Sequence, residues 1–104
     1  MLDETFQALS DPTRRAILGL LVGGERSVNE LVERFDLTQS TVSRHLQVLE
    51  RARLITRRRD GQRRMCVLAP SPLAEVDRWM EDYRRFWSDR LDRLEQVVGK
   101  RSRQ

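Results

Sequence analysis

Residues 37–54 read L-T-Q-S-T-V-S-R-H-L-Q-V-L-E-R-A-R-L, and this stretch decides the fold that we expect. Its apolar residues recur at intervals of four and three, which places on one helical face Val42, Leu46 and Leu49. Thr38 is a suitable N-cap, and Leu37 can pack as a hydrophobic staple against a residue of the first turns. The stretch therefore predicts an amphipathic helix over residues 38–52.

The opposite face of this predicted helix carries short hydroxyls, an amide and guanidinium groups. At 100° per residue, the side chains that point away from the apolar stripe are Ser40, Arg44, Gln47 and Arg51, with Ser43 beside them. Such groups donate to phosphates and bond base edges, and the only acidic residue, Glu50, lies near the helix end. We interpret this segment as a recognition helix for the DNA major groove.

Length and composition restrict the class of protein. The 104 residues suffice for one domain with a modest core, which we expect over residues 1–104. Cys66 is the only cysteine, so no disulfide forms within the chain, which suits a reducing cytoplasm. The start M-L-D-E-T-F lacks the order of a signal peptide, and the longest apolar run, residues 16–22, is too short for a bilayer. We expect a cytoplasmic protein that does not interact with membranes.

The positive charge is concentrated in the middle third of the chain. Net charge is +4, yet residues 38–70 alone hold eight basic and two acidic groups, whereas residues 1–37 hold four and seven. A local basic patch is the electrostatic feature of a surface that binds a polyanion. The simpler interpretation is an arginine-rich composition with solvated faces. That composition explains the residue type but not the clustering.

Three shorter helices are predicted before the recognition helix. The first covers residues 2–9, and Asp11-Pro12 then supplies an N-cap and a first helical residue for the second, which Gly23-Gly24 ends. In the second helix we expect a buried face formed by Ala16, Ile17, Leu20 and Leu21. We expect Arg14 and Arg15 to be solvated or to face phosphate.

The third helix completes a helix-turn-helix. Ser27 and Glu30 have the spacing of a capping box. The apolar side chains that follow are predicted to be buried: Val28, Leu31, Val32 and Phe35. This helix, a turn at Asp36-Leu37 and the recognition helix predict a helix-turn-helix over residues 27–53.

Residues 54–68 have the pattern of a β-hairpin. Two strand-like runs, residues 54–59 and 62–68, are separated by Asp60-Gly61, a strong hairpin signal. The basic residues around this turn are Arg57, Arg58, Arg59, Arg63 and Arg64. A hairpin after a helix-turn-helix forms a winged helix, in which the wing at residues 57–64 lies along phosphates or enters the minor groove. The alternative is a hairpin whose arginines are only solvated.

After the break at residues 69–72, a long amphipathic helix is predicted. Its apolar positions recur in steps of three and four: Leu73, Val76, Met80, Tyr83, Trp87, Leu91, Leu94 and Val98. A second stripe contains Trp79, Phe86 and Val97. Such a helix is about 40 Å long, more than this domain can cover alone. It either cradles a small ligand or pairs with a second protomer, and we favour pairing. The basic tail from Gly99 is expected to fray.

These elements together predict a mainly α fold with a small β-hairpin, namely a winged helix-turn-helix with a long C-terminal dimerisation helix. The chain resembles the ArsR/SmtB-type bacterial repressors. The resemblance is strongest in A-L-S-D-P-T-R-R-A-I-L (residues 8–18), L-T-Q-S-T-V-S-R-H-L-Q-V-L (residues 37–49) and D-G-Q-R-R (residues 60–64). It implies a homodimeric repressor whose two wings flank a palindromic operator in double-stranded DNA.

The resemblance also implies roles for individual residues. The groove-contacting positions would be Gln39, Ser40, Thr41, Ser43 and Arg44, with His45 as a backbone contact. Thr38, Gln47 and the five arginines of the wing complete the predicted DNA-binding set. The dimer would form through residues 1–10 and 71–99, with Leu2 and Phe6 joining the stripe of the long helix.

The metal chemistry that gave the family its name is not predicted for this chain. Metal-sensing members place a Cys-x-Cys pair in the third helix, where this chain has Val32, Glu33 and Arg34. Others place Asp and His ligands on the last helix, which contains no His here. One His and one Cys cannot supply the four donors of a zinc site. The resemblance is therefore to the metal-independent branch, and we expect no metal or other cofactor.

Two other classes of function remain as alternatives. An enzyme is the weaker, because no glycine-rich phosphate loop is present and the sole His has no carboxylate at a motif-like spacing; we expect no catalytic residues. A winged-helix protein-interaction adaptor explains the apolar stripe but not the clustered charge. A small-molecule effector could bind between the last helix and the winged core, although no polar cluster marks that place.

Overall fold

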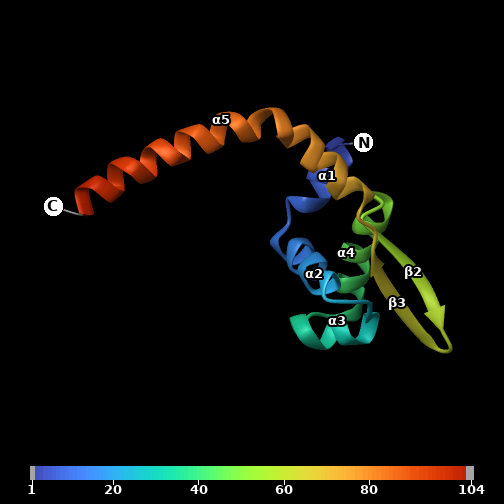
Figure 1. Cartoon of the computed structure of the whole chain (residues 1–104). Helices are drawn as coiled ribbons and strands as arrows, with labels where there is room; N and C mark the ends of the chain where they lie inside the picture. Colours follow the sequence, from blue (N-terminus) through green and yellow to red (C-terminus); the bar gives the residue numbers. More distant parts are fainter. Residues whose placement is uncertain (1, 103–104) are drawn as a thin grey trace. The chain divides into compact units, whose positions relative to one another are not determined.

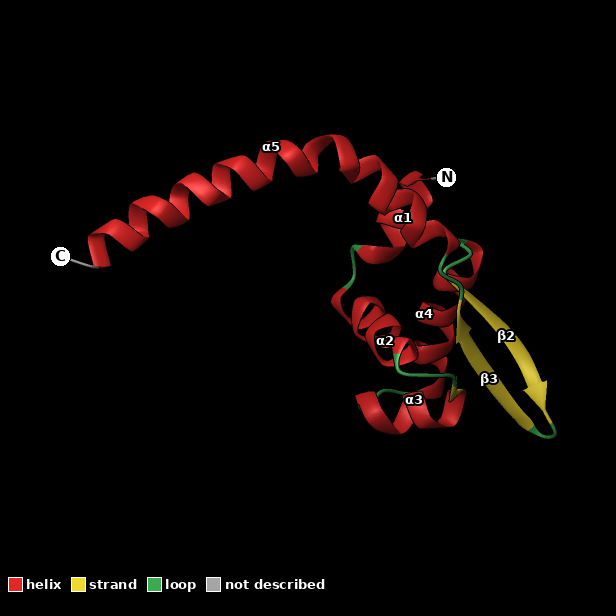
Figure 2. Ribbon diagram, in the orientation of Figure 1, coloured by secondary structure: helices red, strands yellow, loops and turns green. Residues whose placement is uncertain are grey.

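The computed structural model describes the backbone of residues 2–102 and the side chains of residues 2–99 (Figure 1). In chain order the elements are α1 (Leu2–Leu9), α2 (Pro12–Val22), β1 (Arg26–Ser27), α3 (Val28–Phe35), α4 (Gln39–Arg51), β2 (Ile55–Asp60), β3 (Arg63–Leu68) and α5 (Ser71–Ser102). Figure 2 shows how helix dominates this part of the chain, which confirms the predicted mainly α fold with a hairpin.

The chain divides into two compact units, Met1–Leu73 and Ala74–Gln104. The first contains the helix-turn-helix and the hairpin, and the second consists of the remainder of α5. The predicted assignment of residues 1–104 to a single domain, and of residues 1–10 and 71–99 to dimerisation, stays a prediction. Of these residues, 1, 103 and 104 lie outside the described part of the chain.

Local capping determines where α2 begins and ends. The Asp11 carboxylate accepts hydrogen bonds from the backbone N–H groups of Thr13 (2.8 Å) and Arg14 (3.1 Å), and Pro12 is the first helical residue. Gly23 ends the helix and donates its N–H to the carbonyl of Leu20 (3.1 Å). Both predicted boundaries are confirmed.

The predicted buried face of α2 was only partly right. Ile17 and Leu21 are buried and Leu20 is half-buried, but Ala16 is exposed. Leu18 is buried in its place. The core therefore contacts a face rotated toward Leu18, because the elements packed against α2, namely α1, α4 and β3, decide which side of the helix is covered.

The two helices of the helix-turn-helix begin at the predicted caps. Ser27 Oγ accepts from Glu30 N (3.1 Å), and Glu30 Oε1 accepts from Ser27 N (3.3 Å), which confirms the capping box. Asp36 adopts a left-handed conformation (φ 52°) that turns the chain between α3 and α4. Thr38 caps α4 by accepting from Thr41 N (3.2 Å). α4 runs over Gln39–Arg51, one residue shorter at each end than the predicted 38–52.

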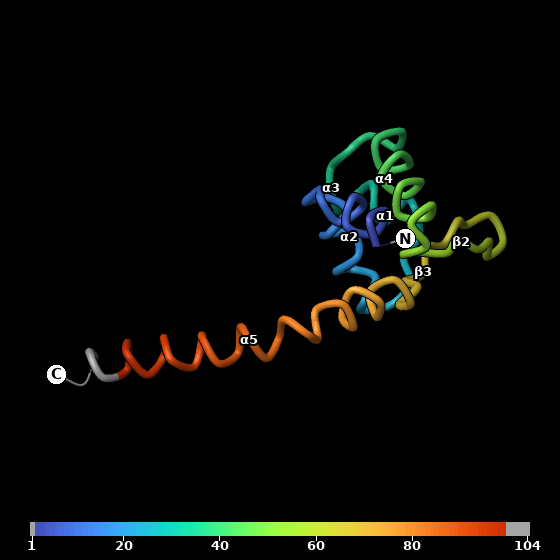
Figure 3. The backbone as a smooth tube through the Cα atoms, turned by 90° about the horizontal axis from the view of Figure 1, so that it is seen from above, coloured from blue at the N-terminus to red at the C-terminus, as the bar shows by residue number. Residues whose placement is uncertain are grey.

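The hairpin belongs to a three-stranded antiparallel sheet of order β1-β3-β2. The two-residue strand β1 was not predicted, since two residues carry no readable alternation. It pairs with β3 through Arg26 opposite Cys66. The predicted turn was displaced by one residue: Asp60 pairs with Arg63, and Gly61, with φ 65°, leads the connecting turn. In Figures 1 and 3 the hairpin extends beyond the helices of the first unit.

The core lies among α2, α3, α4 and the base of the hairpin. Its largest fully buried side chains are Ile17, Leu31, Val42, Leu46, Leu49, Leu54 and Ile55. Val28 is also buried as predicted, whereas Val32 and Phe35 are half-buried against this cluster. The recognition helix is therefore held by its apolar stripe.

α5 is a continuous helix of 32 residues. The prediction of a frayed tail from Gly99 was wrong for residues 99–102, because the helix continues to Ser102; residues 103 and 104 lie outside the described part. Arg84 forms ion pairs with Asp77 and, at 3.6 Å, with Glu81, and these pairs support the exposed helix. Within the residues described, no helix has both the length and the apolar composition that a membrane span requires.

The contribution of the α3 capping box to stability can be measured. Ser27→Ala removes the hydroxyl that accepts from Glu30 N, and we expect a loss of about 1 kcal/mol in the free energy of unfolding. Urea denaturation followed by circular dichroism measures it. Asn29→Ala, an exposed change in the same turn, is the matched control. Equal stability of the two variants would contradict the role assigned to the cap.

Candidate nucleic-acid interface

The polar face of α4 is accessible along the whole helix. Thr38, Gln39, Ser40, Arg44 and Gln47 are exposed, and Thr41, Ser43 and His45 are half-buried. The opposite stripe of Val42, Leu46 and Leu49 is completely buried. Because the buried stripe holds the helix against the core, the predicted reading residues form one outward surface, which we call the reading face.

Three hydroxyl groups gather at the start of α4. Thr38 Oγ1 donates to Thr41 Oγ1 (2.8 Å) and lies 3.2 Å from Ser40 Oγ. The first turn contains no acidic residue. The helix dipole places partial positive charge at this end, so the N-terminal part of the reading face suits a phosphate or an electron-rich base edge.

Two of the wing arginines face each other across the hairpin. Arg59 is directly opposite Arg64, and both are exposed. Like charges in directly opposed positions of an antiparallel pair destabilise it. Since side chains alternate between faces, this pair shares a face with Arg57, which approaches α4. A polyanion beside that face would relieve the repulsion of the tip pair.

Arg57 is placed differently from the other wing arginines. Its Nε atom lies 4.0 Å from Glu50 Oε1 on α4, and its Nε and Nη2 atoms are buried without a hydrogen-bond partner. The side chain therefore spans the gap between the wing and the end of the recognition helix. This placement gives Arg57 a part in orienting the wing, which its sequence position did not reveal.

Arg58 already has an acidic partner within the chain. Its Nε donates to Glu25 Oε2 (3.0 Å) and its Nη2 to Glu25 Oε1, a bidentate pair. These hydrogen bonds raise the pKa of Arg58 above its ordinary value. Arg63, by contrast, lies opposite Asp60 at the tip and is exposed. The five predicted wing arginines thus occupy unequal environments, and Arg59 and Arg64 form the most concentrated charge.

Arg15 is exposed, as predicted, whereas the prediction that Arg14 is solvated or faces phosphate was wrong, because Arg14 is half-buried. Arg14 Nε donates to the carbonyl of Ala8 (2.6 Å) and its Nη2 to that of Gln7 (3.1 Å), while Arg15 Nη1 donates to that of Leu9 (2.7 Å). Both side chains therefore bind the carbonyl end of α1, where cations are favourable. Their position just after a predicted helix end was the available sequence signal.

His45 lies beside Arg14. Arg14 Nη1 is 3.4 Å from His45 Nδ1, so a residue of the reading helix contacts the start of α2. Hydrogen bonds from the backbone N–H groups of Arg14 and Thr13 lower the pKa of Asp11, and the positive charge of Arg14 lowers it further. Sequence reasoning placed His45 on the surface and did not find this contact.

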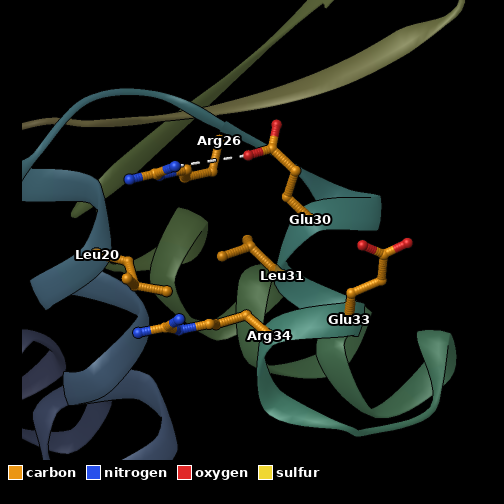
Figure 4. Close-up of a pocket in the computed structure, with 6 residues that line it drawn as sticks. All are labelled: Leu20, Arg26, Glu30, Leu31, Glu33 and Arg34. Carbon is orange, nitrogen blue, oxygen red and sulfur yellow. Dashed lines mark ion pairs between the residues drawn. The ribbon is translucent and has the colours of Figure 1, made fainter.

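Two open grooves border α3. The first has a volume of about 410 Å³ and is lined by Leu20, Arg26, Glu30, Leu31, Glu33 and Arg34 (Figure 4). Inside it Arg26 Nη1 lies 3.6 Å from Glu30 Oε2, and the hydrogen bond from Ser27 N lowers the pKa of Glu30. The second lies between α3 and the wing, beside Arg63 and Arg64. No residue of α4 lines either groove, so they are separate from the reading face.

Potential metal ligands are dispersed in the described part of the chain. Across the residues that the structure describes, no three His, Cys, Asp or Glu side chains come close enough to hold an ion. Cys66 is buried in β3, where burial raises the pKa of its thiol. Val32 is half-buried and Glu33 and Arg34 are exposed on α3, where metal-sensing members carry their cysteines.

The predicted dimer residues differ in exposure. The exposed ones on α5 are Tyr83, Trp87, Leu91, Leu94 and Val98, with exposed fractions of 48–59%. Val76 and Met80 are half-buried, as is Leu2, and Phe6 is 40% exposed. Leu73 packs against the core of the first unit, so burial in that core already accounts for its apolar side chain.

Comparison with known proteins extends over the same elements. A family described as a helix-turn-helix domain matches residues 9–58. The transcriptional repressor SdpR of Bacillus subtilis is 35% identical over 82 residues, which are 79% of this chain and 91% of the repressor.

Solved structures show the same similarity. The crystal structure of an ArsR family transcriptional regulator, RHA00566, is 36% identical with a TM-score of 0.76, covering 84% of this chain and 96% of that one. A homodimeric winged helix-turn-helix DNA-binding domain from Mycobacterium bovis, solved in solution, is 30% identical with a TM-score of 0.64. The match covers 94% of this chain and 77% of that one.

Proposed function

This chain belongs to the ArsR/SmtB family of winged helix-turn-helix transcriptional regulators, and on that premise we propose that it is a homodimeric repressor that binds a palindromic operator. The observation that carries the proposal is the reading face: α4 buries its apolar stripe completely and leaves its amide, hydroxyl and guanidinium side chains outside. An enzymatic activity is not part of the proposal.

The reading face supports contacts to bases and to phosphate. Arg44, Gln47 and Gln39 carry the long donors and acceptors that pair with base edges in the major groove. Thr38, Ser40 and Thr41 are short hydroxyls at the positive end of the helix, which favours the phosphate backbone. Ser43 and His45 lie at the edge of this face. We assign base reading to the first group and backbone contacts to the others.

The wing supplies charge that does not depend on sequence. Arg59 and Arg64 form the tip pair, and Arg63 lies beside them. To bind a phosphate, Arg58 must break its hydrogen bonds to Glu25. If it keeps them, its role is limited to orienting the wing. Arg57 acts between the wing and α4. The tip pair is therefore proposed as the main clamp.

The exposed stripe of α5 supports assembly into a dimer. Apolar side chains of this size are seldom left in water along several helical turns, and a second copy would cover them. A dimer places two reading faces about 34 Å apart, one turn of duplex. The homodimeric relative from Mycobacterium bovis supports this assembly.

We further propose that repression is independent of metal, because the described residues lack a suitable donor set. Any effector would then be another kind of small molecule, bound away from the reading face. The chain would act in the cytoplasm, where its DNA target lies.

The salt dependence of binding tests the proposal. If each protomer places Arg59, Arg63 and Arg64 near phosphates, about six charges are neutralised by the dimer, and affinity should fall with salt at a log–log slope of roughly −5. Fluorescence anisotropy with DNA from the protein's own promoter region measures this slope. A slope near zero, or no binding to that DNA, would favour the protein-interaction adaptor.

Separate variants distinguish reading from clamping. Arg44→Ala should reduce the preference for the operator over unrelated DNA, since each good base contact contributes roughly 1–3 kcal/mol of discrimination. Arg59→Ala should weaken binding to both DNAs alike and make the salt slope less negative by about one per protomer. Competition titrations measure both effects, with Arg85→Ala on α5 as the control for loss of one charge. Identical behaviour of the Arg44 and Arg59 variants would refute this division.

The dimer is tested on α5. Leu91→Glu puts a carboxylate into the apolar stripe, so we expect a monomer in sedimentation velocity at concentrations where the unaltered protein is a dimer. Gln96→Glu adds the same charge on the polar side of the helix and should leave the dimer intact. A dimer that persists in the Leu91 variant would show that the stripe is not the interface.

A further inference from the structure

Arg14 joins three helices through one side chain. Its Nε and Nη2 atoms donate to the carbonyls of Ala8 (2.6 Å) and Gln7 (3.1 Å) at the end of α1, while its Nη1 atom lies 3.4 Å from His45 Nδ1 on α4. Arg14 itself lies in the first turn of α2. We propose that Arg14 is a positioning residue that sets the tautomer of His45, so that the Nε2–H group of His45 donates to a DNA phosphate.

The direction of the contact follows from the chemistry of the two groups. A guanidinium has five N–H donors and no acceptor. Nδ1 must therefore present its lone pair to Arg14, because an Nδ1–H would place two donors against each other. A neutral imidazole with a free Nδ1 lone pair carries its proton on Nε2. The contact thus favours one tautomer of His45.

Arg14 can favour one tautomer of His45 because hydrogen bonds hold its own side chain in place. Two backbone carbonyls at the carboxyl end of α1 accept from its guanidinium, and that helix end attracts positive charge. Asp11 keeps the backbone at the start of α2 in place by accepting from Thr13 N and Arg14 N. Asp11 and Arg14, both at the start of α2, are charged groups that lie near His45.

The consequence concerns DNA binding, and this part rests on the proposed function. His45 follows Arg44 and is half-buried at the edge of the reading face. Its ring nitrogens are directed away from each other, so a ring whose Nδ1 is engaged by Arg14 has its Nε2–H on the other side. A neutral N–H donor at this edge suits a phosphate oxygen. α1 would then influence the reading face through Arg14, since the carbonyls of α1 hold the guanidinium.

His45 is the only histidine of the chain, which makes the tautomer directly measurable. In the untagged protein at about pH 8, above the ordinary pKa of histidine, long-range ¹⁵N–¹H NMR reports which ring nitrogen carries the proton. We expect protonated Nε2 and unprotonated Nδ1 in the unaltered protein. We expect the same in Arg15→Ala, a control that loses only the bond to Leu9. Arg14→Ala should show a larger fraction of the Nδ1–H form than the unaltered protein, and an unchanged tautomer in this variant would overturn the positioning role. A dominant Nδ1–H form in the unaltered protein would overturn the proposal.

A double-mutant cycle tests the link to DNA. Arg14→Ala and His45→Ala should each weaken operator binding by roughly tenfold per protomer, about a hundredfold for the dimer, as expected for loss of a hydrogen bond to a charged group in each copy. The double variant should be no weaker than His45→Ala alone, because Arg14 acts through His45. Additive losses would overturn the positioning role. Arg14→Lys, which keeps the charge but not the guanidinium geometry, replaces Arg14→Ala if that variant does not fold by circular dichroism.

The two measurements separate this inference from the proposed function. The NMR experiment needs no DNA. If the expected tautomer is found but the unaltered protein binds no DNA, the proposed function fails and the phosphate role fails with it. If the protein binds its operator but the tautomer is mixed or the losses are additive, only the role of Arg14 fails.

Discussion

The winged helix-turn-helix is built around one buried stripe on α4. Val42, Leu46 and Leu49 are completely buried, so the helix cannot rotate without exposing apolar surface to water. This packing decides, without any direct contact to them, that Arg44 and Gln47 point outward. The caps at Thr38 and Ser27, the left-handed turn at residue 36 and the core of α2 and α3 all serve to hold that stripe in place. The reading face is therefore the side of α4 that remains exposed once its apolar side is packed against the core.

Electrostatics divide the arginines into two kinds. Arg14, Arg57 and Arg58 lie near partners within the chain, namely carbonyls, Glu50 and Glu25, and so contribute to the orientation of helices and wing. Arg59 and Arg64 lie opposite each other near the tip, and this pair of like charges destabilises the hairpin in the free protein. A surface that is unfavourable alone and favourable beside phosphates is what a DNA-binding wing requires. Net charge alone does not distinguish these two kinds.

α5 exposes apolar side chains that a single chain does not cover. Its aromatic and aliphatic side chains are about half exposed in a single chain, and some contact each other: the rings of Trp79 and Tyr83 lie 5.1 Å apart, and Arg90 stacks 4.1 Å from the centre of Phe86. Such contacts cover only part of the stripe. In the proposed dimer a second copy would cover the remainder and would also supply the symmetry that a palindromic operator matches.

The sequence by itself determined the elements whose causes are local. The caps at Asp11, Ser27 and Thr38, the helical period of α4 and the Asp-Gly hairpin signal depend on neighbours within a few residues, and they predicted the winged helix-turn-helix. The one-residue shift of the turn, the strand at Arg26–Ser27 and the burial of Leu18 instead of Ala16 depended on what packs against them. Three contacts could be found only in the folded structure: Arg14 with His45, Arg57 with Glu50 and Arg58 with Glu25. The members of each pair belong to different helices, strands or loops, so no local sequence pattern predicts that they meet.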